Sequence, residues 1–360
     1  MEHTTISINQ HSNLFTNVPE IDTQILLHLP DDSLGCVCAI NKYATSLCDE
    51  NFWKERFKQT FGVTLDKYKK SKEKYKDIYK EFVNLSLDKQ LIKASEKGYL
   101  PLVKELLNRG VDIHAPQGGD YALQMASKNG HIEIVILLLD HGADIYAPYG
   151  RNGVLENALK NGHLDVVKVL LDRGADIHAG DDNAIQTAAQ CGHLDVFKLL
   201  LDRGANIHVY DDDALRWAAG YGHLEVVKFL LDHGAHIHAA DDQSLMLAVD
   251  NGDSQMVNLL LDNHANINVK NDYALRYSSL YGYLEIVKLL LDRGADIHSQ
   301  DDDALIRATK NSKFEVVKLL LDRGANIVTL EQLVPTLSED LQLNLNDIIA
   351  QYKKPYLDIH

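Results

Sequence analysis

The sequence predicts an all-α protein in which about eight helix-turn-helix units form a solenoid after a small N-terminal helical domain. The first observation is the recurrence of Gly-Ala-(Asp/Asn)-Ile at intervals of 32, 32 and then 30 residues. A fixed period in this range is typical of repeat architectures. The second observation is that each interval contains two segments with helical spacing of apolar residues. The glycine of the motif, or the residue in its place, is Gly110, Gly142, Gly174, Gly204, Gly234, His264, Gly294 and Gly324.

The composition narrows the class of protein. The 360 residues carry a formal charge of −16, and 45% of them are hydrophobic, which argues against global disorder. The longest apolar run, residues 134–139, is far shorter than the roughly 18 residues of a membrane helix, and the first five residues lack the pattern of a signal peptide. We therefore expect no membrane partner and a cytoplasmic location, with the nucleus as the alternative.

Cysteines and charges add two further expectations. The four cysteines, Cys36, Cys38, Cys48 and Cys191, form no C-x-x-C pair. We therefore expect free thiols in a reducing compartment, without a zinc knuckle or a disulfide framework. Residues 1–86 carry 11 basic and 12 acidic side chains, whereas residues 87–360 carry 25 and 40. The acidic part would repel a phosphate backbone, so nucleic acid is not an expected partner.

Five segments are expected along the chain. Residues 1–17 form a flexible N-terminus, and residues 18–60 form short amphipathic helices separated by polar turns. Residues 61–87 form a linker helix with one packed face. The repeats occupy residues 88–328, and residues 329–360 form helices that cap the far end of the array, as solenoids require.

Residues 212–235 illustrate one unit. A first helix is predicted over about 213–221 and a second over about 224–233, and each ends at a glycine that adopts the left-handed conformation at little cost. Leu215 and Ala218 are the predicted packing positions of the first helix. The predicted core face of the second helix consists of Leu224, Val227, Leu230 and Leu231.

An aspartate or asparagine precedes every first helix. Such residues are good N-caps, which accept hydrogen bonds from the free N–H groups of the first turn and contribute about 1 kcal/mol each. The predicted caps are Asp88, Asp120, Asn152, Asp182, Asp212, Asp242, Asp272 and Asp302.

The sixth unit departs from the pattern of the others. Its second helix opens with Asp253-Ser254-Gln255-Met256 instead of His-Leu-Glu-Val, and His264 replaces the glycine of the motif. Because a non-glycine residue adopts a positive φ only at a cost, Asn263 or His264 would be strained. We expect a locally less stable segment near residues 250–266.

The repeat resembles the ankyrin repeat. The resemblance covers residues 88–328 and rests on the signature Ala-x-x-x-Gly-His-(Leu/Ile)-(Glu/Asp)-x-Val-x-x-Leu-Leu-x-x-Gly-Ala-(Asp/Asn)-Ile. It implies a solenoid whose concave face, formed by the first helices, binds partner proteins. Most units here span 30 residues, against about 33 in the family, and Asp-x-Ala-Leu replaces the usual Thr-Pro-Leu-His. A finger shorter than the usual β-hairpin is therefore expected.

The variable positions of the first helices contain a candidate target-binding patch. In units five to seven these positions are rich in Tyr, Trp and Arg, which are enriched at interface hot spots. An alternative is that some of these aromatic side chains only fill gaps between units. Aspartate runs in the loops either steer a basic partner or form a solvated edge. The predicted contiguous patch consists of Arg216, Trp217, Tyr221, Tyr273, Arg276, Tyr277 and Tyr281.

The N-terminal segment is either a cap for the first repeat or a separate docking module. Its Pro-Glu start, its Leu-x-x-Val-Cys second helix and its Asp-x-x-Phe-Trp ending resemble an F-box, although Asn41-Lys42-Tyr43 stands where the family has a tryptophan. The order of an F-box followed by ankyrin repeats is similar to that in proteins of large DNA viruses and their amoebal hosts, which would imply a role in virus–host interaction in the host cytoplasm. The resemblance implies docking of the Skp adaptor of a cullin–RING ubiquitin ligase through Pro19, Ile25, Leu26, Leu29, Leu34, Val37 and Cys38.

No residue pattern points to catalysis. The sequence contains no phosphate-binding glycine loop, no G-x-S-x-G and no H-E-x-x-H. The group His233/His236/His238 has no carboxylate or cysteine to complete a zinc site, so neither a metal nor a cofactor is expected. We expect a monomeric, non-enzymatic adaptor that recruits a target protein to a ubiquitin ligase. The alternative is a scaffold without a ligase link, whose N-terminal segment only caps the repeats.

Overall fold

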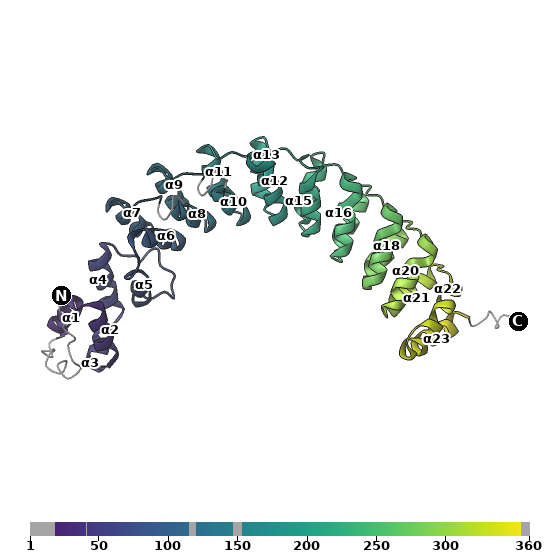
Figure 1. The fold of residues 1–360 in the computed structure, drawn as a ribbon, viewed down its shortest axis with the longest axis horizontal. Helices are drawn as coiled ribbons and strands as arrows, with labels where there is room; N and C mark the ends of the chain where they lie inside the picture. Colours follow the sequence, from purple (N-terminus) through teal and green to yellow (C-terminus); the bar gives the residue numbers. More distant parts are fainter. Residues whose placement is uncertain (1–18, 41, 115–119, 147–152, 354–360) are drawn as a thin grey trace. The chain divides into compact units, whose positions relative to one another are not determined.

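The computed structural model describes residues 19–40, 42–114, 120–146 and 153–353 of the chain. The expected flexible N-terminus (residues 1–17), the predicted cap Asn152 and residues 354–360 lie outside these ranges. Every regular element in the described ranges is a helix, as predicted, and no strand occurs in them. The chain forms two compact regions, an N-terminal region (Met1–Ala175) and a C-terminal region (Asp176–His360). Figure 1 colours the helices in sequence order, from purple at the N-terminus to yellow at the C-terminus.

The N-terminal region begins with a small helical head, which consists of helices α1–α4. Helix α4 begins where the Asp49 carboxylate accepts a hydrogen bond from the Phe52 N–H at 2.9 Å. It ends at Gly62, whose φ of 80° lies in the left-handed region. The buried side chains of α4 include Phe52, Trp53 and Phe57, which form much of the core of the head. The helices are α1 (Pro19–His28), α2 (Asp31–Ile40), α3 (Lys42–Leu47) and α4 (Glu50–Phe61).

The Arg56 guanidinium joins the head to helix α5 (Tyr75–Phe82). It donates to the carbonyl oxygens of Leu27 and Leu29, the second at 2.8 Å, and to the Asp31 carboxylate at 2.9 Å. It also donates to the Tyr79 hydroxyl at 3.2 Å, which itself donates to Asp31 at 2.7 Å. Loss of this one cation would leave several acceptors between α1, α2 and α5 without a donor, which is costly where they are shielded from water.

Cys38 and Cys48 form a disulfide, which corrects the expectation of free thiols. The bond joins the C-terminal part of α2 to the residue that follows α3, with the two Cα atoms 6.2 Å apart. That separation lies within the usual disulfide range. The short α3 folds the chain back on α2, so two cysteines that form no recognisable sequence motif meet. The argument from free thiols for a reducing compartment therefore fails for this pair.

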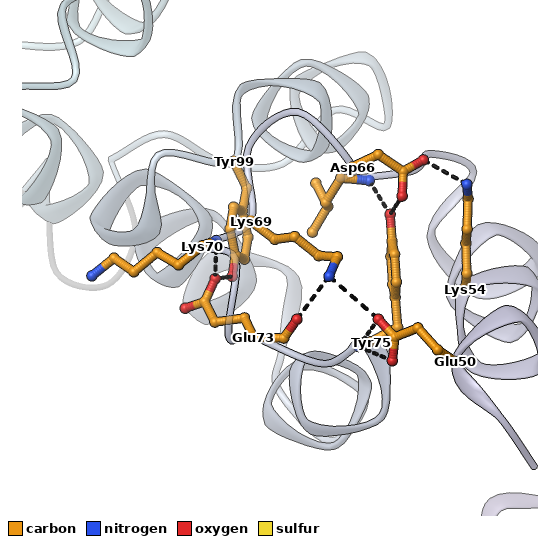
Figure 2. A network of polar contacts seen from close by, with 9 residues as sticks. Glu50, Lys54, Asp66, Lys69, Lys70, Glu73, Tyr75 and Tyr99 are labelled. Carbon is orange, nitrogen blue, oxygen red and sulfur yellow. Dashed lines mark hydrogen bonds and ion pairs between the residues drawn. The ribbon is translucent and has the colours of Figure 1, made fainter.

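The linker helix is shorter than predicted, because only α5 is helical and residues 62–74 form turns and irregular chain (Figure 2). The Glu73 carboxylate accepts hydrogen bonds from the Lys70 N–H at 2.8 Å and from the Tyr99 hydroxyl at 3.0 Å. These polar contacts shape the linker and connect it to the first repeat.

Tyr75 holds the other side of the same linker (Figure 2). Its hydroxyl accepts a hydrogen bond from the Leu65 N–H at 2.5 Å and donates to Asp66 at 3.3 Å. Asp66 also pairs with the Lys54 ammonium at 2.6 Å. Burial raises the pKa of Tyr75 to about 12, and the neighbouring Asp66 acts in the same direction. The phenol therefore stays protonated and can serve as donor and acceptor at once.

Pairs of a first and a second helix follow in both regions, as the period predicts. In the N-terminal region the pairs are α6 (Leu87–Lys97) with α7 (Leu100–Asn108), α8 (Tyr121–Lys128) with α9 (Ile132–Asp140), and α10 (Gly153–Lys160) with α11 (Leu164–Asp172). In the C-terminal region they are α12 (Ala179–Cys191) with α13 (Leu194–Asp202), α14 (Asp213–Gly220) with α15 (Leu224–Asp232), α16 (Ala239–Asp250) with α17 (Ser254–Asp262), α18 (Val269–Tyr281) with α19 (Leu284–Asp292), and α20 (Ser299–Lys310) with α21 (Phe314–Asp322).

The packing positions of the first helices are buried as predicted. Leu215 and Ala218 on α14 are each 0% exposed, and their equivalents in the other units are equally enclosed. The second helices differ slightly from the prediction, because Val226 is buried on α15 whereas Leu224 and Leu231 are only half-buried. Helix α15 packs between the second helices of both neighbouring repeats, α13 and α17, so its buried face includes the adjacent residues Val226 and Val227.

The predicted N-cap aspartates do not cap their helices. Asp120 and Asp212 have left-handed φ values of 41° and 54°, and neither side chain accepts a hydrogen bond from its own helix. Three consecutive left-handed residues form the turn in the later units, for example Ala240, Asp241 and Asp242. Asp88, by contrast, lies inside the first turn of α6. The turn directs each carboxylate away from the first turn of its helix, which is why the capping prediction is wrong.

These aspartates instead connect one unit to the next. The buried Asp242 carboxylate accepts a hydrogen bond from the N–H of Asn266 in the following unit at 2.8 Å and from the His238 ring at 3.0 Å. Asp120 makes the corresponding bonds to Asp144 and His114, both at 2.9 Å. A histidine four residues before the aspartate repeats this pairing in most units.

A second column of histidines also joins neighbouring units. The His131, His163 and His223 rings hydrogen-bond the carbonyl oxygens of Glu96, Lys128 and Gln190, at 3.1, 2.9 and 2.8 Å. Each of these carbonyls lies at the end of the preceding first helix. The recurrence of histidine after the helix glycine therefore reflects a bond between repeats.

Helices α22 (Ile327–Leu333) and α23 (Glu339–Lys353), with a short 3-10 turn η2 (Val334–Thr336), follow the last pair. The Tyr352 hydroxyl attaches α23 to α21, donating to the Asp322 carboxylate at 2.6 Å. Burial and that carboxylate raise the pKa of Tyr352 to about 12. Among the helices of the described residues, none combines the length and the apolar character needed to cross a bilayer.

Candidate partner-binding face

The seven residues of the predicted target-binding patch lie on two first helices of the C-terminal region, α14 and α18, or, for Tyr221, directly after α14. We call this set, Arg216, Trp217, Tyr221, Tyr273, Arg276, Tyr277 and Tyr281, the aromatic face. Trp217 is 39% exposed, Tyr221 54% and Tyr281 47%. Such exposure of large aromatic side chains is uncommon for residues that only fill gaps between repeats.

On α14, one carboxylate positions two members of the aromatic face. Asp213 accepts a hydrogen bond from the Arg216 guanidinium at 2.7 Å and from the Trp217 indole N–H at 3.0 Å. The Trp217 ring lies beside that of Tyr221, with centroids 5.8 Å apart. The three side chains are therefore held in place before any partner arrives.

On α18, the tyrosines form a row along the helix because they are spaced four residues apart. Tyr273 and Tyr277 stack with centroids 4.0 Å apart, and Tyr277 and Tyr281 follow at 6.4 Å. The Arg307 guanidinium of α20 lies 5.2 Å from the centre of the Tyr277 ring, within cation–π range. Arg307 thus extends the row to the next first helix, although it was not among the residues of the predicted patch.

Asp303 on α20 holds the two arginines at the end of this row. Its carboxylate accepts hydrogen bonds from the Nε atoms of Arg276 and Arg307, each at 2.5 Å. Burial acts to raise the pKa of Asp303, but the two guanidinium groups outweigh it and lower the pKa below its ordinary value. The carboxylate therefore stays ionised and fixes both cations.

Helix α16 connects the two halves of the aromatic face. The Arg216 guanidinium reaches Gln243 on α16 at 3.1 Å, and the Tyr273 hydroxyl donates to Asp250, the last residue of α16, at 2.8 Å. Burial and the hydrogen bond to Asp250 raise the pKa of Tyr273. The seven predicted residues thus form a set that is continuous through α16.

The head residues predicted to dock a Skp adaptor separate into an outer and an inner group. Pro19 is exposed, and Ile25 and Leu29 are half-buried. A shallow groove on α1 is lined by Ile21, Gln24, Ile25, His28 and Leu29. The inner group is buried in the core of the head and consists of Leu26, Leu34, Val37 and Cys38.

Sequence reasoning missed the aspartates as contacts between units. The signal was present, because a histidine precedes the aspartate by four residues at His178–Asp182, His208–Asp212, His238–Asp242 and His298–Asp302. Two columns that repeat together at a fixed offset indicate contact between their side chains. Taken alone, the aspartate column predicted only N-caps.

Comparison with known proteins agrees with this architecture. The family model "Ankyrin repeats (3 copies)" matches residues 91–181, 178–241 and 245–330, and ankyrin repeats are typically protein-interaction modules without catalytic activity. No curated protein matches the chain significantly. The matched segments, the paired helices and the buried Leu/Ala columns together show that the chain belongs to the ankyrin-repeat family.

Proposed function

We propose that the protein is an adaptor that holds a target protein on the aromatic face and the Skp adaptor of a cullin–RING ubiquitin ligase on its head. The observation that carries the first half is the exposure of Trp217, Tyr221 and Tyr281 at α14 and α18, the first helices on either side of α16. Tyr, Trp and Arg dominate binding energy at protein interfaces. The mechanism is proximity, because tethering raises the effective concentration of the target at the ligase.

The internal contacts of the aromatic face favour tight binding. Ordering a side chain on association costs about 0.5–1.5 kcal/mol. Asp213 already fixes Arg216 and Trp217, and Asp303 already fixes Arg276. Much of that entropic cost is therefore met in the free protein.

The second half of the proposal rests on the resemblance of the head to an F-box and on the outer surface of α1. Ile21 is 50% exposed, and it lines the groove together with Ile25 and Leu29. We propose that this groove is the adaptor contact. The burial of Leu26, Leu34 and Val37 favours the second candidate function, a scaffold whose head only caps the first repeat.

The target half is tested with the double variant Trp217→Ala/Tyr281→Ala. Proteins captured from cells by tagged wild-type chain are compared with those captured by the variant. The matched control is Leu284→Ala, which removes a side chain of similar exposure (37%) from a second helix. We expect the double variant to lose partners that the control retains. Equal capture by all three chains would refute the target face.

The ligase half is tested with a purified Skp adaptor. Wild-type chain is expected to co-purify with it, and Ile25→Glu/Leu29→Glu is expected not to. The control Val328→Glu places the same charge on a 48% exposed position of α22. If the wild type does not bind, the ligase link is wrong and the scaffold function stands. Circular dichroism of each variant verifies that the helices persist.

A further inference from the structure

The turn before α14 contains a group of side chains that no other described unit has. The Asp212 carboxylate faces two imidazoles: His208 Nδ1 lies 2.7 Å from Oδ1, and His236 Nδ1 lies 2.7 Å from Oδ2. The potential ligand atoms of the three residues all lie within 4.8 Å of one another. Elsewhere in the described residues, the equivalent aspartates that pair with histidine each pair with one, as at His238–Asp242 and His298–Asp302.

The second imidazole results from one exception in the repeat. The position after Gly-Ala is aspartate or asparagine in every unit except this one, where it is His236. At the other positions the side chain accepts a hydrogen bond from the backbone N–H two residues later, as Asn206 does for His208 at 3.0 Å and Asn266 for Asn268 at 3.0 Å. The His236 ring instead turns to Asp212 in the preceding turn, with its Nδ1 2.7 Å from Oδ2.

We propose that His208, Asp212 and His236 form a binding site for a divalent transition metal of the zinc class. Two imidazole nitrogens and a carboxylate are ligands that suit Zn²⁺ and Co²⁺, and a site with three protein ligands leaves the remaining positions to water. The site lies at the surface, since the side chains of His208 and His236 are 45% and 71% exposed. An ion can therefore enter without opening the fold.

The surroundings of Asp212 support a site that is already assembled. The carboxylate is 1% exposed, and the N–H of His236 donates to its Oδ2 at 2.6 Å. That bond orients the carboxylate between the two rings, as partners outside the ligand set do in metal proteins. The two imidazole rings lie with centroids 4.7 Å apart. Small outward shifts of the two nitrogens would admit an ion with usual Zn–N and Zn–O distances of about 2.0–2.2 Å.

Binding requires each Nδ1 to face the ion without a proton. A neutral imidazole that donates from Nδ1 to Asp212 in the free protein therefore moves that proton to Nε2 by exchange with water. No net proton is released from such an imidazole, and the carboxylate ligates in its ionised form. Binding weakens when the imidazoles are protonated, as for any histidine ligand.

A metal here would bridge two repeats. His208 and Asp212 lie between α13 and α14, whereas His236 follows α15. The ion would fix the start of α14, the helix that carries Arg216 and Trp217, against the next unit. The inference does not depend on the proposed adaptor function.

The test measures Co²⁺ binding to the full chain by its visible absorption and Zn²⁺ binding by calorimetry. The variants His236→Asn and His208→Asn install residues that the chain itself has at equivalent positions, Asn266 and Asn268, so both should fold. We expect each to weaken binding at the tightest site by more than the ~10-fold that loss of an outer partner typically costs. The control His298→Asn, from a unit with one imidazole, should leave that affinity unchanged.

Two results would overturn the site. One is wild-type chain that binds neither ion. The other is equal affinity in the wild type and in His236→Asn, which would assign any binding to other surface histidines. A supporting result is a rise in Tm with Zn²⁺ that is present in the wild type and in His298→Asn but absent in His236→Asn and His208→Asn, since a ligand that binds only the native state stabilises it.

Discussion

Replacing Gly192 with alanine should destabilise the C-terminal region more than the same change at Gly222, although the two glycines occupy equivalent positions in their repeats. Both end a first helix or follow it with a left-handed backbone, at φ values of 75° and 78°. A Cβ on Gly192 would lie 2.6 Å from both Cγ and Cε1 of His223. A Cβ on Gly222 would meet only Asp253 Oδ2, at 3.6 Å, because the sixth unit lacks the histidine of this column.

The magnitude follows from these contacts. The left-handed conformation costs a non-glycine residue about 1–2 kcal/mol, and this part is common to both variants. At Gly192 the His223 ring must also move, which breaks its 2.8 Å hydrogen bond to the Gln190 carbonyl at a cost of about 1 kcal/mol. Loss of ring packing adds to this. We expect Gly192→Ala to exceed Gly222→Ala by about 1–2 kcal/mol in the free energy of unfolding.

Urea denaturation followed by circular dichroism measures the difference, with hydrogen exchange to locate it, since repeat arrays need not unfold in one step. The double variant Gly192→Ala/His223→Asp copies the sixth unit and should recover the excess cost, as a double-mutant cycle would report. Equal destabilisation by Gly192→Ala and Gly222→Ala, or no recovery in the double variant, would refute the proposed contact between units.

Three further predictions concern the turns and the aromatic face. Asp242→Ala leaves the partners of a buried carboxylate unpaired and should lower the free energy of unfolding, measured by urea denaturation, by about 2–3 kcal/mol. Asp241→Ala, at the exposed neighbouring position, should lower it by about 1 kcal/mol or less. Similar values for both variants would contradict the bridging role of Asp242. In the wild type, we expect the turn after α17 to exchange amide hydrogens faster than the equivalent turns of the fourth and fifth units. Because His264 has a φ of 68°, His264→Gly should raise the free energy of unfolding by up to about 1 kcal/mol and slow exchange in this turn. Because the pKa of Asp303 is lowered in the folded state, its ionised form adds stability above the unfolded-state pKa, and this contribution is lost as pH falls through the folded-state pKa. In Arg307→Leu, an NMR titration should find a higher pKa for Asp303 than in the wild type. An unchanged pKa would exclude the Arg307 guanidinium as a cause of the lowering.

The repeat architecture was predictable because its information is local and periodic. The spacing of Gly-Ala-(Asp/Asn)-Ile predicts the number of helix pairs, and helical periodicity predicts Leu215 and Ala218 as buried. The predicted helices over 213–221 and 224–233 agree with α14 and α15 within one or two residues.

The features that the sequence did not reveal depend on residues that meet only after folding. Asp242 has the same residue type as an N-cap, and only the left-handed turn directs its carboxylate to a backbone N–H 24 residues later. Cys38 and Cys48 form no motif, and their meeting depends on how α3 folds back. In the linker, hydrogen bonds from Tyr99 and Lys70 to Glu73 compete with helix formation.

The most direct test of the target face is site-specific photocrosslinking in cells. A photoreactive phenylalanine derivative replaces Tyr221, which is 54% exposed directly after α14, or Leu284, which is 37% exposed at the start of α19. We predict that the probe at position 221 crosslinks a discrete protein partner and that the probe at position 284 does not. Crosslinks of equal yield and identity from both positions, or none from position 221, would contradict the role of the aromatic face.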